Sequence, residues 1–156
     1  MPSAVPQPGT LAPEFTLTSD EDAEVSLAGL RGQRVVLFFY PKALTAGCTI
    51  QACAFRDAQE EFAARGAVVF GVSPDAPQLL RRFRDKAHLS FRLLSDPDHA
   101  VALRYGVWGP KSYLGKHYEG IHRSFFVIDK EGRIVAANPK ISPTDTVPQA
   151  LAALGG

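Results

Sequence analysis

Hydrophobic residues in this chain form short continuous runs, and the segments between the runs have helical spacing. The runs Arg34–Tyr40 (RVVLFFY) and Ala67–Ser73 (AVVFGVS) are rich in β-branched and aromatic residues, which is typical of strands buried on both faces. A helical pattern extends from about residue 48 to residue 65 and stops at Gly66, and a second covers Pro77–His88. The first half of the chain therefore predicts alternating strands and helices.

The second half continues this alternation and ends in a hairpin and a helix. Its predicted elements are a strand over Phe91–Leu94, a short helix over Ala100–Tyr105, strands over Ser124–Asp129 and Arg133–Ala137, and a last helix from Thr144 or Asp145 to about Leu154. This order predicts an α/β, thioredoxin-like fold in which helices flank a central mixed β-sheet. No linker or repeat divides the chain, so residues 1–156 are expected to form one domain, with the proline-containing residues 1–12 as an extended lead-in.

Composition and charge exclude several classes of protein. Seventeen Lys and Arg against sixteen Asp and Glu leave a net charge of +1, so no basic excess points to nucleic acid or an anionic membrane. No segment approaches the roughly 18 apolar residues of a membrane helix, and the first residues do not resemble a signal peptide. We therefore expect a cytoplasmic protein whose two cysteines are thiols used for chemistry or metal binding.

The turn after Tyr40 contains a cysteine placed for reactivity. If a helix begins near Thr45, Cys48 lies in its first turn, where unpaired N–H groups and the helix dipole favour the nucleophilic thiolate. The Thr45 hydroxyl is then able to bond the sulfur or a bound oxygen, and Pro41 removes one N–H at the pocket mouth. Taken singly, a buried cysteine, a helix cap and a turn proline are simpler interpretations; together the three residues favour a reactive thiol.

A second cysteine, Cys53, follows five residues later. At 100° per helical residue the two side chains are about 140° apart, with Cys48 on the core side and Cys53 on the polar side. This C-x4-C spacing differs from the C-x-x-C of thioredoxins, whose cysteines can bridge in place. A zinc site is disfavoured, because neither His117 nor His122 lies at zinc-finger spacing from the pair.

The segment FFYPKALTAGCTIQACAFRD resembles the active-site stretch of peroxiredoxins. Their P-x-x-x-T-x-x-C motif is represented here by Pro41, Thr45 and Cys48. A second cysteine five residues on, followed by F-R-D, is similar to the bacterioferritin comigratory protein (PrxQ) class. The likeness extends over roughly residues 9 to 154 and includes the motifs GTLAPEFTL, LSDPDHAVALRYGVWG, GIHRSFFVIDKEGRI and PKISPTD.

The resemblance implies a thiol-dependent peroxidase that reduces hydrogen peroxide and organic hydroperoxides. Cys48 would be the peroxidatic residue and form a sulfenic acid, and Cys53 would resolve it as an intramolecular disulfide. The family's catalytic arginine corresponds to Arg123, whose guanidinium would stabilise a thiolate and bind a peroxide oxygen. Thioredoxin, or glutaredoxin, is the implied reductant; no cofactor or metal is implied, and we expect a monomer that binds neither nucleic acid nor membrane.

The loop departs from the family pattern, and two other functions stay open. Family members commonly have Asp-Asn before the threonine, Pro after it and Glu in the following helix; here these positions are Ala43, Leu44, Ala46 and Gln51. The pocket rim is therefore less polar, which leaves the preferred peroxide and the docking of partners open. The alternatives are a protein thiol–disulfide oxidoreductase and a redox-sensing module that uses the same cysteine pair.

Overall fold

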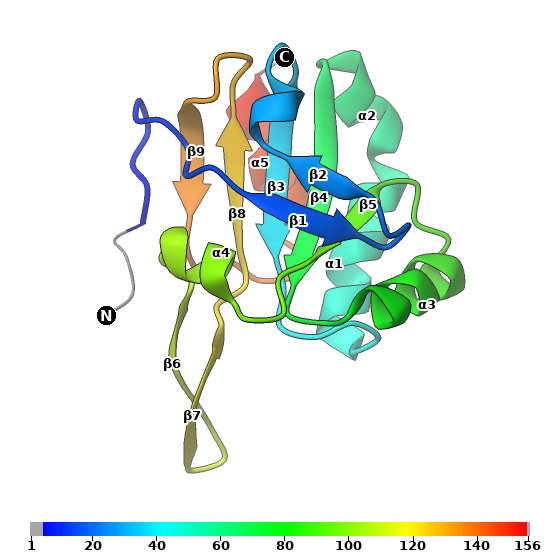
Figure 1. The fold of residues 1–156 in the computed structure, drawn as a ribbon, viewed down its shortest axis with the longest axis vertical. Helices are drawn as coiled ribbons and strands as arrows, with labels where there is room; N and C mark the ends of the chain where they lie inside the picture. The colour runs from blue at the N-terminus through cyan, green and yellow to red at the C-terminus, as the bar shows by residue number, and fades with distance from the viewer. Residues whose placement is uncertain (1–4, 156) are drawn as a thin grey trace.

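The structure is a computed structural model that describes residues 5–155, and a seven-stranded mixed sheet forms its centre (Figure 1). The strands lie in the order β2 (Glu24–Ser26), β1 (Thr16–Ser19), β5 (Arg92–Ser95), β4 (Ala67–Ser73), β3 (Arg34–Phe39), β8 (Ser124–Ile128) and β9 (Ile134–Asn138). The helices are α1 (Ala46–Asp57), α2 (Gln59–Ala64), α3 (Pro77–Ala87), α4 (Ala100–Arg104) and α5 (Thr146–Leu154), with a 3-10 turn at Ala28–Leu30. None of the helices in this part of the chain reaches the length and apolarity that a membrane span needs.

Strand β3 lies at the middle of the sheet and is buried on both faces. It pairs in parallel with β4 and antiparallel with β8, and β4 pairs in parallel with β5. Val36 and Phe38 belong to the core beneath α1, α2, α3 and α5, whereas Leu37 and Phe39 belong to the core on the α4 side. The continuous apolar run that predicted a buried strand is thus explained by two separate cores.

The predicted helix over residues 48–65 is wrong in its extent. The structure contains two helices, α1 and α2, separated at Ala58, whose φ of −97° and ψ of 10° end the first helix. Phe62 of α2 is nevertheless buried in the same core as Phe55 of α1, as expected for residues seven apart, which lie on one helical face. Hydrophobic spacing alone did not reveal this break, because Ala58 favours a continuous helix.

Residues 108–121 form an antiparallel ribbon that the sequence analysis missed. Strands β6 (Trp108–Tyr113) and β7 (Lys116–Ile121) pair only with each other and project from the body of the molecule (Figure 1). Their two-residue turn has positive φ at both Leu114 and Gly115, as a tight hairpin requires. The chain leaves β7 at the base of the ribbon and reaches Arg123 just before β8.

The described part of the lead-in is bound along the sheet. The Gly9 amide donates to the Ile134 carbonyl at 2.8 Å, and the Ala12 amide donates to the Gly132 carbonyl at 2.9 Å. Residues 1–4 of the predicted lead-in lie outside the described residues.

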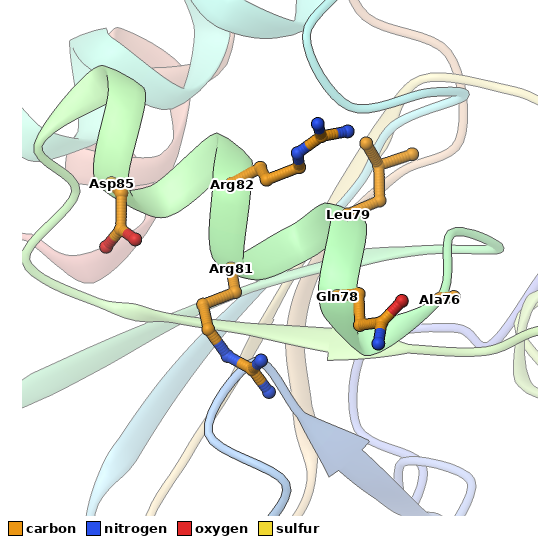
Figure 2. Close-up of a pocket in the computed structure, with 6 residues that line it drawn as sticks. All are labelled: Ala76, Gln78, Leu79, Arg81, Arg82 and Asp85. Carbon is orange, nitrogen blue, oxygen red and sulfur yellow. The ribbon is translucent and has the colours of Figure 1, made fainter.

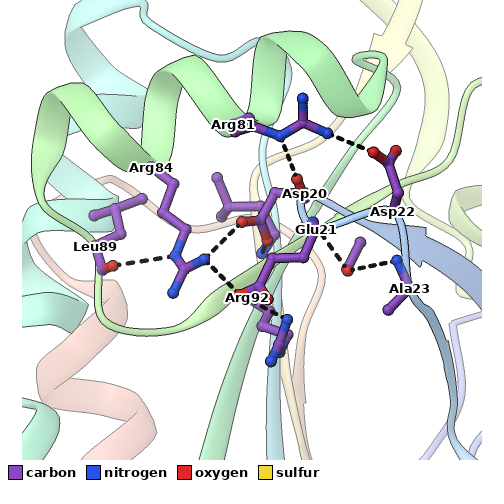
Figure 3. Close-up of polar contacts among 10 residues, drawn as sticks. Asp20, Glu21, Asp22, Ala23, Arg81, Arg84, Leu89 and Arg92 are labelled. Atoms are coloured by element: carbon purple, nitrogen blue, oxygen red, sulfur yellow. Dashed lines mark hydrogen bonds and ion pairs between the residues drawn. The ribbon is translucent and has the colours of Figure 1, made fainter.

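Charged residues fasten the β1–β2 turn to α3 and β5 (Figure 3). Asp20 is completely buried; its carboxylate accepts from the Leu93 amide at 3.0 Å and from Arg84 Nη1 at 3.0 Å. The neighbouring Asp22 makes an exposed ion pair with Arg81 at 2.7 Å. The two aspartates therefore offer a matched comparison between a buried and an exposed charge.

We expect Asp20→Asn to lower the free energy of unfolding by about 2 kcal/mol. The asparagine side chain has one acceptor oxygen, so its NH2 group would face either the Leu93 N–H or Arg84, and both of these are donors. Asp22→Asn, which removes an exposed pair, should cost less than about 1 kcal/mol. Urea unfolding of the two variants measures both values. Equal losses would show that the buried carboxylate has no special role in joining the turn to α3.

Candidate active site

Cys48 lies in the first turn of α1, at the carboxyl end of the central strand. Thr45 is the N-cap residue with extended backbone angles, and α1 begins at Ala46, two residues before the predicted helical pattern, so that Cys48 lies in its first turn. The Cys48 side chain is 1% exposed. The first turn, Ala-Gly-Cys-Thr, contains no acidic side chain, so the positive end of the helix dipole acts on the sulfur without a compensating carboxylate.

The loop before α1 is held by side chains at the ends of β4 and β5. Asp75 accepts from the Ala43 amide at 2.7 Å and from the Ser73 hydroxyl at 2.8 Å, and its carbonyl accepts from the Ser95 hydroxyl at 2.6 Å. Leu44 has a φ of 66°, a left-handed conformation that the family's usual asparagine adopts more easily than leucine. The loop therefore keeps its path even though its residues depart from the family pattern.

Arg123 reaches the sulfur from the other side. Its Nη2 lies 3.4 Å from Cys48 Sγ, and its Nη1 donates to Gln51 Oε1 at 2.8 Å. A Cβ at Gly47 would lie 3.1 Å from Arg123 Nη2, so glycine leaves room for the guanidinium. The contact that the family resemblance implied between Arg123 and Cys48 is present, although 75 residues separate them.

Gln51 is a residue whose position the sequence analysis noted without finding its role. Its side chain is completely buried; Oε1 accepts from Arg123, and Nε2 donates to Thr146 Oγ1 at 3.0 Å. The Thr146 hydroxyl in turn donates to the Ser142 carbonyl at 2.8 Å. A hydrogen-bonded chain thus connects the cysteine to α5, and the neutral amide leaves the charge of Arg123 uncompensated.

The Thr45 hydroxyl does not bond the sulfur in this structure, and its contact with a bound peroxide oxygen stays a prediction. The Thr45 hydroxyl donates to the Lys42 carbonyl at 2.7 Å, which closes the turn before the helix. The Thr45 carbonyl accepts from the Thr49 amide and from the Thr49 hydroxyl. Thr45 therefore shapes the start of α1, and Pro41 lies half-buried where the loop leaves β3.

Cys53 lies half-buried and packs against the apolar core beneath the helices, so it is less exposed than its predicted place on the polar side of α1 implies. Arg56, three residues later on nearly the same side, donates to the Ala87 carbonyl at the end of α3 at 2.6 Å. Both cysteines are free thiols, and α1 is continuous between them. Within residues 5–155, no three His, Cys, Asp or Glu side chains converge as metal ligands.

Two further basic side chains lie near the site, and neither was predicted from sequence. Lys111 Nζ donates to the Ile121 carbonyl at 2.8 Å, and burial together with the charge of Arg123 lowers the pKa of Lys111. Burial, followed by the charges of Lys111 and Lys140, lowers the pKa of His122. Both residues reach the site through the β6–β7 ribbon, which hydrophobic patterning did not reveal.

The Trp108 side chain makes two contacts at the base of the ribbon. Its ring stacks on His99 with centroids 3.7 Å apart, and its Nε1 donates to Glu119 Oε2 at 3.2 Å. These contacts assign Trp108 a packing role.

The sequence of the chain matches the AhpC/TSA family over residues 8–137. It is also 50% identical over 126 residues to peroxiredoxin Bcp of Escherichia coli strain K12, and the match covers 81% of each chain. This chain is a peroxiredoxin of the bacterioferritin comigratory protein (PrxQ) class.

Solved structures agree with that assignment. A bacterioferritin comigratory protein of Xanthomonas campestris, studied for its alkyl peroxide reduction activity, has a TM-score of 0.85 and 33% identity over 90% of this chain and 89% of its own. Peroxidoxin BcpB of Mycobacterium tuberculosis has a TM-score of 0.84 and 34% identity over 96% of both chains. The family and thioredoxin-like fold predicted for this peroxiredoxin are confirmed, while the roles of single residues stay predictions.

We expect Gln51→Ala to slow the reaction of Cys48 with hydrogen peroxide about tenfold, because Arg123 loses the acceptor that positions its guanidinium. Gln51→Glu restores an acceptor but compensates the charge of Arg123 and cannot donate to Thr146, so it should recover only part of the rate. Stopped-flow single-turnover kinetics measures the effect, and Gln149→Ala, an exposed glutamine on α5, is the matched control. A Gln51→Ala rate equal to that of the control would exclude a positioning role.

Proposed function

We propose that Cys48 reduces hydrogen peroxide and alkyl hydroperoxides, and that Cys53 resolves the product in the same chain. The observation that carries the proposal is the 3.4 Å contact between Arg123 Nη2 and Cys48 Sγ at the start of α1. A cationic donor and a helix N-terminus converge on one sulfur, which is the environment that favours a thiolate. The Xanthomonas campestris relative, studied for alkyl peroxide reduction, supports this substrate class.

In the first step, the Cys48 thiolate attacks the terminal oxygen of the peroxide. A new S–O bond forms as the O–O bond breaks, and the electron pair of that bond leaves on the distal oxygen. The leaving oxygen takes a proton and departs as water or an alcohol, and Cys48 becomes a sulfenic acid. Arg123 and free N–H groups at the start of α1 stabilise the negative charge during this transfer.

In the second step, the Cys53 thiol condenses with the sulfenic acid. A disulfide forms and water leaves, so each turnover consumes one peroxide and requires two electrons from an external dithiol. We propose thioredoxin, or glutaredoxin, as that dithiol, supplied in a reducing compartment such as the cytoplasm. Because both cysteines are on one helix, a single copy of the chain is sufficient.

The disulfide cannot form while α1 is intact. Two residues five apart in a helix have Cα atoms about 8.6 Å apart. A disulfide requires Cα atoms within roughly 7 Å of each other. Resolution therefore unwinds the segment from Cys48 to Cys53, which also contains Gln51 and so releases Arg123. The lost helical hydrogen bonds cost a few kcal/mol at about 1 kcal/mol each, which formation of the covalent bond offsets.

Replacement of the proposed nucleophile tests the first step. Cys48→Ser should abolish peroxide reduction without unfolding the protein, because a hydroxyl is not ionised in the same environment. Arg123→Ala should retain Cys48 but lower its rate constant by about 10² to 10³. Peroxide consumption and circular dichroism measure the two effects. More than a tenth of the wild-type activity in Cys48→Ser would contradict the assignment.

Replacement of Cys53 should spare the first step and block the second. We expect Cys53→Ser to react once with peroxide at a near-normal rate and to accumulate Cys48 sulfenic acid. A dimedone adduct on Cys48, detected by mass spectrometry, identifies that product. Normal multiple turnover of this variant with thioredoxin would show that the sulfenic acid is resolved by another route.

A further inference from the structure

A groove runs along the surface between α3 and the loop that precedes α1. Its lining includes Leu44 of the loop and three exposed residues of α3, namely Arg82, Asp85 and Lys86. A second hollow continues along α3 and shares Arg82 and Asp85 with the first (Figure 2). The two hollows together are called the α3 groove here.

The α3 groove lies beside the segment that must move when the cysteines are oxidised. Leu44 immediately precedes the N-cap residue of α1 and is 40% exposed. Arg56 ties α1 to the end of α3 through the Ala87 carbonyl, and the half-buried Cys53 precedes Arg56 by three residues, about 60° away around α1. The groove therefore lies next to the segment that carries the proposed Cys48–Cys53 disulfide, which a protein reductant would have to reach.

The charge of the groove is positive and unpaired. Arg82 and Lys86 are one helical turn apart, and neither forms an ion pair within residues 5–155. The other arginines of α3 are paired: Arg81, which also lines the second hollow, forms an ion pair with Asp22, and Arg84 bonds Asp20 and Glu21 (Figures 2 and 3). Asp85 is the acidic side chain that lines the groove.

The groove also offers apolar surface. Leu44 stands in a left-handed conformation with its side chain partly exposed, and Leu79 is half-buried on the same side of α3 as Arg82 (Figure 2). An apolar centre with basic side chains around it matches a partner whose contact face is apolar with an acidic rim. A second copy of this chain would bring the same unpaired positive charges against each other.

We propose that the α3 groove is the docking surface for an acidic protein dithiol that reduces the oxidised cysteine pair. Carboxylates of the partner pair with Arg82 and Lys86, and the apolar surface around its reactive cysteine covers Leu44. This inference rests on the proposed function, since it takes the Cys48–Cys53 disulfide as the target.

The electron transfer is an exchange of sulfur bonds. A thiolate of the partner attacks one sulfur of the disulfide, which breaks the S–S bond and forms a mixed disulfide between the two proteins. The second thiol of the partner then attacks the partner's own sulfur in the mixed disulfide, which forms the partner's disulfide and expels the remaining cysteine of this chain as a thiolate, so two electrons and two protons pass to Cys48 and Cys53. The partner leaves with its own disulfide, and α1 can refold with both thiols restored.

Charge reversal tests the docking surface. The reductant is an acidic thioredoxin, kept reduced by thioredoxin reductase and NADPH. We expect Arg82→Glu combined with Lys86→Glu to raise the KM for thioredoxin about tenfold at low ionic strength, with most of the difference lost at about 0.5 M salt. Asp85→Asn should lower the KM about twofold. Lys130→Glu, an exposed change beyond the opposite end of β8, is the control and should leave the KM unchanged.

Two further measurements separate docking from chemistry. Turnover supported by dithiothreitol and the single-turnover rate of Cys48 should be unchanged in every variant. The double replacement of Arg82 and Lys86 by Gln, which is milder than charge reversal, should raise the KM about threefold.

If both double variants leave the KM for thioredoxin within twofold of the wild-type value, the docking surface is wrong and the proposed function is unaffected. The same conclusion follows if the variants lose as much activity with dithiothreitol as with thioredoxin. Wild-type turnover with dithiothreitol but not with thioredoxin would also overturn it, since no protein dithiol would then be shown to dock. Failure of the wild type with both reductants would instead overturn the proposed function, and the docking inference with it.

Discussion

The guanidinium of Arg123 holds the site together, because it contacts the Cys48 sulfur at 3.4 Å and the Gln51 amide at 2.8 Å. Three distant parts of the chain meet at this contact: the start of α1, the residue that precedes β8, and Thr146 at the start of α5. The position of Arg123 depends in turn on the sheet, since β3 and β8 are paired neighbours. The fold therefore matters to the chemistry mainly by placing one cation beside one sulfur.

In the proposed mechanism, the same contact links reactivity to a change of shape. Gln51 lies between the two cysteines on α1, so a disulfide that unwinds this segment must also remove the acceptor of Arg123. The reduced state, with an intact helix, is then the state equipped to react with peroxide. The proposed oxidised state would give up that arrangement and bring its sulfurs within reach of a reductant at the α3 groove.

Sequence patterns predicted the parts of the fold whose burial is continuous or periodic. Both β3 and β4, and the start of α1 at Ala46, follow from apolar runs and turn residues. The β6–β7 ribbon was missed because it pairs only with itself and lies outside the sheet, so no buried face imposes a period on its sequence. The direction of the Thr45 hydroxyl and the role of Gln51 were missed because each depends on contacts that only tertiary packing creates.

Amide hydrogen exchange of residues 46–58, compared between the reduced and the peroxide-oxidised protein, tests this account most directly. If resolution unwinds α1, its amides are strongly protected in the reduced state and lose protection over the first turn and a half after oxidation. Mass spectrometry of the same samples establishes that the Cys48–Cys53 disulfide has formed. Equal protection in both states, with that disulfide present, would contradict the coupling between helix unwinding and resolution.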